Sequence, residues 1–94
     1  MKILRQGDVV LTPAELPRAA KLTGSEVRIA SETGNPHVLN GRVYRVSRQQ
    51  QQQQYVVLDA PAEMTHPQHA ALRLEPGTYR VSTVRDYLPT RLLD

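Results

Sequence analysis

Apolar and polar residues alternate with a period of two along most of this chain, and glycine, proline or asparagine interrupts the alternation every few residues. Successive side chains of a β-strand point to opposite faces, so this period is typical of half-buried strands and not of helices. In "EVRIASE", for example, Val27 and Ile29 share one face and Arg28 lies on the other. Five to seven short strands joined by turns in one small chain predict an all-β fold, either an antiparallel barrel or a sandwich.

Turn signals give the expected bounds of these strands. A first strand is expected over residues 4–12, with Gly7 as a bulge or bend. The pair Asn40-Gly41 is the strongest short hairpin signal in the chain, so the apolar stretches on its two sides are expected to be two strands that pair across it. The last strand is expected over residues 78–87.

Six consecutive glutamines lie within the segment 48–55, and the β-branched run that follows them suits a central strand. The run is too short to imply a polyglutamine function. We expect it to be the tip or loop of a hairpin, or the extended edge of one, and the alternative is a contact with a partner.

Composition limits both the core and the chemistry. We expect one domain over residues 1–94. The chain has no cysteine, so disulfides and cysteine-ligated zinc are excluded, and a metal would need nitrogen and oxygen ligands. It also lacks Phe and Trp, so Val, Leu and Ile must fill the core. No apolar segment reaches the roughly 20 residues of a membrane span, and the N-terminal apolar run is too short for a secretory signal. We therefore expect a soluble cytoplasmic protein.

The formal net charge is +3, and ten of the twelve basic residues are arginine, which favours carboxylate and phosphate partners. Most of these arginines stand between apolar residues, a spacing that a solvated strand face explains as well as a phosphate track does. Small barrels that bind single-stranded nucleic acid stack bases on exposed rings, whereas the four tyrosines here are mostly expected in the core. A nucleic-acid partner is therefore only weakly favoured.

The three histidines stand in two proline-containing turns. In "THPQH", Pro67 suits the second position of a type I turn, which makes His66 and His69 its outer corners, within about 7 Å at their Cα atoms. His37 follows a proline in "SETGNPH". If the turns share one end of the barrel, three imidazoles suit catalytic zinc, and two imidazoles with a carboxylate such as Glu32 suit non-haem iron. A neutral histidine pair could also act as a general base, and the alternative to all of these is a set of exposed polar corners.

Two shorter motifs add candidate binding residues. In "RQGD", Gln6 and Asp8 lie on one face of the expected strand, and the alternative is a capped bend. In "RDY", Arg85 and Asp86 point to opposite faces of an extended strand, so one of them could face a pocket. Gln6, Asp8, Arg85 and Tyr87 are therefore candidates, with an edge-strand ion pair as the alternative for the second motif.

The order of "RQGDVVL", "ETGNPHVL", "HPQHAALRLEPGTYRV" and "RDYLP" resembles a family of small, largely uncharacterised bacterial and phage proteins. The resemblance covers most of the chain. It implies that His37, His66 and His69 stand at histidine positions of the family and Glu32 at its glutamate, which strengthens the case for a histidine site. It implies no activity.

This chain departs from the family pattern at two positions. Asn35 stands where the family usually has its first histidine, and Asp86 replaces a glutamate. A four-histidine site is therefore not intact, whereas a three-histidine or histidine-carboxylate site could be.

The sequence leaves three functions open. The first is a β-barrel with a histidine-lined site for a divalent metal (zinc or iron) or a polar ligand; an enzyme of this kind would carry out metal-assisted hydrolysis, with Glu32 as base. The second is a non-enzymatic module that binds a protein or nucleic-acid partner in a phage or bacterial system. The third is a structural or homo-oligomeric role, which exposed strand edges would serve.

Overall fold

The computed structural model describes residues 2–31, 34–48 and 51–84, and within these ranges the regular elements are strands. They are β1 (Leu4–Gln6), β2 (Val9–Pro13), β3 (Lys21–Ala30), β4 (Pro36–Arg48), β5 (Gln51–Leu58), β6 (Ala62–His66), β7 (His69–Leu74) and β8 (Gly77–Thr83). The expected all-β fold is confirmed. No helix in this part of the chain is long and apolar enough to cross a membrane.

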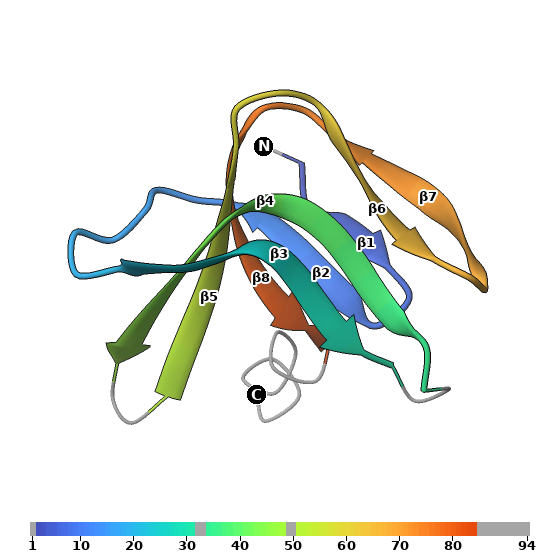
Figure 1. Cartoon of the computed structure of the whole chain (residues 1–94), viewed down its shortest axis with the longest axis horizontal. Coiled ribbons are helices and arrows are strands. Elements are labelled where there is room, and N and C mark those ends of the chain that lie inside the picture. Colours follow the sequence, from blue (N-terminus) through green and yellow to red (C-terminus); the bar gives the residue numbers. More distant parts are fainter. Residues whose placement is uncertain (1, 32–33, 49–50, 85–94) are drawn as a thin grey trace.

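The strands form one curled antiparallel sheet. Its order is β1-β2-β8-β5-β4-β6-β7, and β3 pairs with β4 outside this path. The sheet curls until β1 comes against β7, which nearly closes it into a barrel (Figure 1). The side-chain amide of Gln6 on β1 spans this seam, because it donates hydrogen bonds to the carbonyls of Met64 on β6 and Ala70 on β7. Of the two expected architectures, the molecule adopts the barrel.

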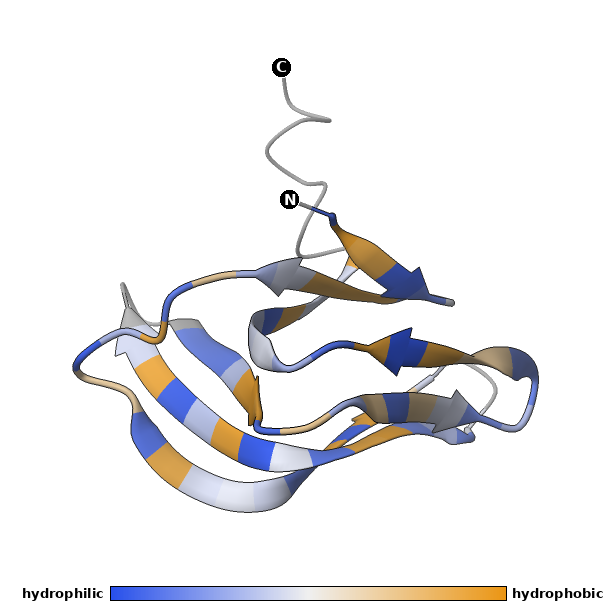
Figure 2. Ribbon diagram, turned by 90° about the horizontal axis from the view of Figure 1, so that it is seen from above, coloured by the Kyte–Doolittle hydropathy of each residue, from blue (hydrophilic) through white to orange (hydrophobic). Residues whose placement is uncertain are grey.

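The buried apolar residues form one core. Figure 2 shows the alternation of hydrophilic and hydrophobic residues along the strands that supply it. The core is built almost entirely of valine and leucine, as expected for a chain without Phe or Trp: Val9, Leu11, Val27, Leu39, Val43, Val56, Leu58, Met64, Leu74, Tyr79 and Val81. The hydroxyl of Tyr79 donates to the carbonyl of Glu75 over 2.7 Å. Burial, reinforced by the nearby carboxylate of Glu75, raises the pKa of Tyr79.

Strand β4 continues through Asn40 and Gly41, so the hairpin expected at this pair is wrong. Among the described residues, strand β4 has three partners. β3 pairs with most of the length of β4, β6 pairs with β4 near its start, and β5 pairs with the second half of β4. Gly41 lies where the partner changes from β6 to β5. A Cβ atom at Gly41 would lie 2.7 Å from methyl carbons of both Val56 and Leu58. Glycine is needed here because the strand passes close to the core, and not because the chain turns.

The single strand expected over residues 4–12 is instead two strands, which corrects the interpretation of Gly7 as a bulge. β1 and β2 form a hairpin in which Gln6 pairs with Val9 across the turn Gly7-Asp8. Gly7 has a φ of 58°, in the left-handed region that glycine adopts without a Cβ penalty. This division, together with a β3 that begins as early as Lys21, gives eight strands among the described residues where five to seven were expected.

Residues 51–54 of the glutamine run belong to β5, which forms a hairpin with β4. Among the described pairings, Gln54 also pairs with Val81 on β8, whereas residues 51–53 pair with β4 alone. This confirms the extended edge of a hairpin for residues 51–53, and not a loop. Residues 49 and 50 lie outside the described residues. At the other end of the chain, β8 ends at Thr83, and residues 85–87 of the expected last strand also lie outside the described residues.

Candidate functional site

Three segments meet at one end of the barrel, at the right of Figure 1: the β1–β2 turn, the start of β4 and the β6–β7 turn. His37 lies on β4, His66 ends β6 and His69 begins β7. The ring centroids of His37 and His66 are 4.4 Å apart, those of His66 and His69 are 4.7 Å apart, and those of His37 and His69 are 5.8 Å apart. The fold therefore brings the three histidines together. We call these three residues the histidine cluster.

The β6–β7 turn has the form that its sequence predicts. His66 and His69 are paired across Pro67-Gln68, which makes them the outer corners of a two-residue loop. Pro67 fixes its own φ and donates no hydrogen bond, so it suits the position after the strand ends. The turn thus places two imidazoles side by side, and closure of the barrel brings the third against them.

His37 is fully buried, and both of its ring nitrogens face a partner. Nδ1 lies 2.9 Å from Oε1 of Gln6, and Nε2 lies 3.2 Å from Oδ1 of Asp8. Gln6 is buried, whereas 44% of the Asp8 side chain is exposed. Burial lowers the pKa of His37 from its ordinary 6.5; repulsion from His66 lowers it as well, and Asp8 opposes both effects. At neutral pH the imidazole of His37 is therefore mainly uncharged.

His66 is held in one neutral tautomer. The backbone N–H of Gln68 donates to Nδ1 over 3.0 Å, so this nitrogen uses its lone pair. Nε2 must then carry the hydrogen, and it donates to the backbone carbonyl of Asn35 at 3.1 Å, with the hydroxyl of Ser31 at 3.2 Å. The Ser31 hydroxyl donates to the same carbonyl over 2.7 Å. Both nitrogens of His66 are therefore committed within the protein.

Asp8 and His69 form the outer rim of the site. His69 is exposed, and none of the described residues hydrogen-bonds to its ring. Of the two Asp8 carboxylate oxygens, only Oδ1 has a partner within the described ranges. Gly7 lies beside both rings, since a Cβ atom there would be 2.8 Å from Nε2 of His69 and 3.2 Å from Cε1 of His37. Glycine therefore allows the turn and also leaves room for the imidazoles.

No metal-binding group is found among the described residues at the histidine cluster. In the part of the chain that the structure describes, no group of three or more histidine and acidic side chains could hold a metal ion. His66 supplies a physical reason, because one nitrogen accepts a backbone N–H and the other carries a hydrogen, whereas a ligand nitrogen needs a free lone pair. The coordination expected for His37, His66 and His69 thus gains no support, although the three side chains do converge.

The remaining sequence candidates divide into two groups. Gln6 and Asp8 lie at the site and both contact His37. Glu32, Arg85 and Tyr87 lie outside the described residues, so the roles expected of them stay predictions.

Ser31, Asn35 and Gln68 complete the site, and the sequence assigned none of them a contact there; Asn35 stood out only as a departure from the family pattern. The Gly34 N–H donates to the Ser31 carbonyl over 3.0 Å. Asn35 and Gln68 act on His66 through backbone atoms, which every residue type offers. The residue types at Asn35 and Gln68 therefore give little indication, in the sequence, of their contacts with His66. Gly34, next to Asn35, has a positive φ of 89°.

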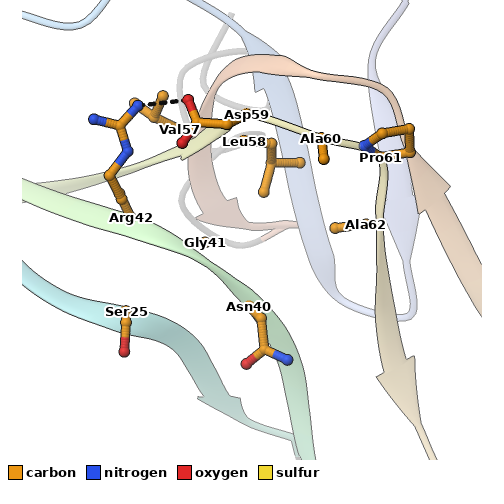
Figure 3. A pocket seen from close by; sticks show the side chains of 10 residues that line it. All are labelled: Ser25, Asn40, Gly41, Arg42, Val57, Leu58, Asp59, Ala60, Pro61 and Ala62. Atoms are coloured by element: carbon orange, nitrogen blue, oxygen red, sulfur yellow. Dashed lines mark hydrogen bonds and ion pairs between the residues drawn. The ribbon is translucent and has the colours of Figure 1, made fainter.

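A separate surface pocket of about 460 Å³ lies where β4 passes from β6 to β5 (Figure 3). An ion pair between Nη2 of Arg42 and Oδ1 of Asp59, 2.8 Å long, lies at one side of it. Most of the other lining residues are small or aliphatic, and none belongs to the histidine cluster: Ser25, Asn40, Gly41, Val57, Leu58, Ala60, Pro61 and Ala62. The pocket therefore lies apart from the histidine cluster.

Comparison with known proteins gives a family without a named activity. No curated protein matches the chain, and no solved structure does. A family model matches residues 5–84, which include Gln6, Asp8 and the three histidines. The bacterial or phage origin implied by the resemblance stays a prediction. With most of its length covered, the chain belongs to the family described as a domain of unknown function, DUF8820.

Proposed function

We propose that this domain binds a small polar ligand at the histidine end of the barrel, with Asp8 and His69 as the contacting residues. The observation that carries this proposal is the contrast within the site. His37 and His66 are buried and use their ring nitrogens inside the protein. Asp8 and His69 reach the surface with polar atoms that no described residue engages. The buried His37 and His66 thus support two side chains at the surface, those of Asp8 and His69, which can contact a ligand.

The chemistry of these two side chains defines the class of ligand. A carboxylate accepts hydrogen bonds and carries negative charge, so Asp8 favours an N–H or O–H donor, and above all a cationic one. A neutral imidazole can donate or accept, so His69 adds a second contact with either kind of group. We therefore expect a small ligand with an ammonium or similar donor. The rings of His37 and His66 are already fixed beneath the rim, so less conformational entropy is lost when a ligand binds.

A binding role needs only the groups that the geometry supplies. Hydrolysis would also need a base, and the residue expected to act as one, Glu32, lies outside the described residues. A metal would require His66 to give up hydrogen bonds that it makes in the fold. These two alternatives become outcomes of the same experiment.

The experiment is a nuclear magnetic resonance titration of the tag-free, ¹⁵N-labelled full chain. Methylammonium chloride, sodium acetate and zinc chloride are added separately at constant ionic strength and neutral pH. We expect methylammonium to shift the resonances of residues around Asp8 and His69 in a saturable manner, and acetate to leave them unchanged. Asp8→Ala and His69→Ala should each abolish the response, whereas Asp59→Ala, which removes an exposed carboxylate at the separate pocket, should retain it.

Two results would count against the proposal. The first is a methylammonium response that is absent, or that persists undiminished in Asp8→Ala. The second is stoichiometric zinc binding that is lost in His37 and His66 variants, which would favour the metal site.

A further inference from the structure

The amide of Gln6 has one allowed orientation. Its Nε2 lies 2.9 Å from the carbonyl oxygen of Met64 and 2.8 Å from that of Ala70. The two N–H groups satisfy both carbonyls, whereas a flipped amide would set Oε1 against two oxygens that cannot donate. Oε1 therefore faces Nδ1 of His37 as an acceptor, at 2.9 Å. It follows that Nδ1 of His37 carries a hydrogen.

This assignment places no proton on the other ring nitrogen of His37, Nε2. A neutral imidazole carries a single N–H, so with Nδ1 protonated, Nε2 of His37 presents a lone pair. That lone pair faces Oδ1 of Asp8 at 3.2 Å, and an ionised carboxylate is also only an acceptor. The contact becomes a hydrogen bond when one more proton lies between the two atoms, either on Nε2 or on Oδ1.

We propose that Asp8 and His37 form a proton-binding site, in which one proton held between Oδ1 and Nε2 docks the exposed carboxylate against the buried ring. Solvent supplies the proton, and no other bond changes. Without it, the carboxylate turns towards solvent, which the partial exposure of the Asp8 side chain allows. The inference goes beyond the proposed function and does not depend on any ligand.

The surroundings of His37 set the pH at which the proton binds. Among the described residues, His66 from β6 and His69 from β7 are the other ionisable groups against the ring, and β3 places the apolar Ile29 opposite His37. Arg5 on β1 directs its Nε to the Gly7 carbonyl, 2.6 Å away, in the same turn as Asp8. Burial and the two neighbouring rings lower the pKa of His37, so the proton enters only when the solution is acidified.

The test is a pH titration of the ligand-free full chain with ¹⁵N-labelled histidine, in which each ring nitrogen reports its own protonation. We expect His37 to be the Nδ1–H tautomer at alkaline pH and to gain its proton at Nε2 on acidification. The Asp8 carboxyl ¹³C resonance should shift with the same midpoint. In Asp8→Asn the side-chain N–H can donate to the Nε2 lone pair and the negative charge is gone. The His37 midpoint should therefore fall below that of the wild type, while Asp59→Asn should match the wild type.

Two results would overturn the inference. One is an Nε2–H tautomer of His37 at alkaline pH, which the wild-type protein alone reveals. The other is a His37 midpoint that is the same in Asp8→Asn, Asp59→Asn and the wild type. The ligand titration above can fail while this one succeeds, or the reverse, so the two proposals are separately testable.

Discussion

At the scale of single residues, Gln6 does the most to hold the site in one arrangement. It is buried, and its amide makes three hydrogen bonds that reach β4, β6 and β7. Buried polar groups are costly unless paired, so a residue that satisfies three of them at once fixes both the seam of the barrel and the tautomer of His37. An apolar residue in place of Gln6 could form none of these hydrogen bonds.

Gln6→Ala should therefore destabilise the protein strongly. The carbonyls of Met64 and Ala70 and the Nδ1–H of His37 would lose their partner, and we expect a loss of about 3 kcal/mol in the free energy of unfolding. Urea denaturation followed by circular dichroism measures it. Gln53→Ala is the matched control, because Gln53 only accepts one bond, from the Tyr55 hydroxyl, and its loss should cost less than about 1 kcal/mol. Equal effects of the two substitutions would show that the seam does not depend on Gln6.

The sequence singled out Gln6 as a candidate binding residue, and the structure places it against His37 by a different local arrangement. Alternation placed Gln6 and Asp8 on one face of a single strand, whereas Asp8 lies in a hairpin turn. Both nevertheless reach His37. The partners of Gln6, 58 and 64 residues away along the chain, follow from barrel closure and leave no local signal.

At the scale of elements, β4 organises the sheet because it pairs with three other strands. The hairpin predicted at Asn40-Gly41 was wrong, because this pair lies within β4. Asn40-Gly41 favours a turn when only neighbouring residues are considered. Pairing with β3 on both sides of Gly41, across a register shift at this point, keeps β4 in the sheet, and local preferences commonly yield to such tertiary contacts.

β4 passes so close to β5 at Gly41 that a single added methyl group there should destabilise the protein. Gly41→Ala should lower the free energy of unfolding by about 1 to 3 kcal/mol, since the new Cβ atom would overlap methyl groups of Val56 and Leu58 in the core. Gly24→Ala on β3 is the control, because a Cβ atom there meets nothing within 4 Å. Denaturation midpoints would give both values. A large loss in Asn40→Ala, an exposed strand position, would instead restore the turn interpretation.

At the scale of the whole molecule, barrel closure buries His37 and sets the pH dependence of stability. In the unfolded chain His37 has its ordinary pKa of 6.5, and in the folded protein burial lowers this pKa. Well above pH 6.5 neither state holds the proton, and the contribution of this residue is complete. As the pH falls below 6.5 the unfolded chain binds the proton first, so stability is lost until the pH passes the folded value.

We therefore expect the free energy of unfolding to decrease as the pH falls from about 7.5 through 6.5. Urea denaturation at several pH values would show it. Asp8→Asn should steepen the decrease, because the charge that opposes the lowered pKa of His37 is removed, and it should raise stability at alkaline pH by about 1 kcal/mol through the new hydrogen bond. Asp59→Asn should leave the slope unchanged. A slope that is flat, or that is the same in both variants, would contradict this account.

The sequence by itself determined the all-β class, the aliphatic core and the turn that sets His66 beside His69. Each follows from local properties: a period of two, the absence of Phe and Trp, and the fixed φ of Pro67. Only the tertiary structure decided that β4 is continuous, that His37 meets the other two rings, and that backbone groups of Asn35 and Gln68 fix the tautomer of His66. These features depend on hydrogen bonds between segments that are distant in sequence, or on main-chain atoms common to all residues. Residue type therefore predicted which side chains are candidates, and closure of the barrel determined which of them contact one another.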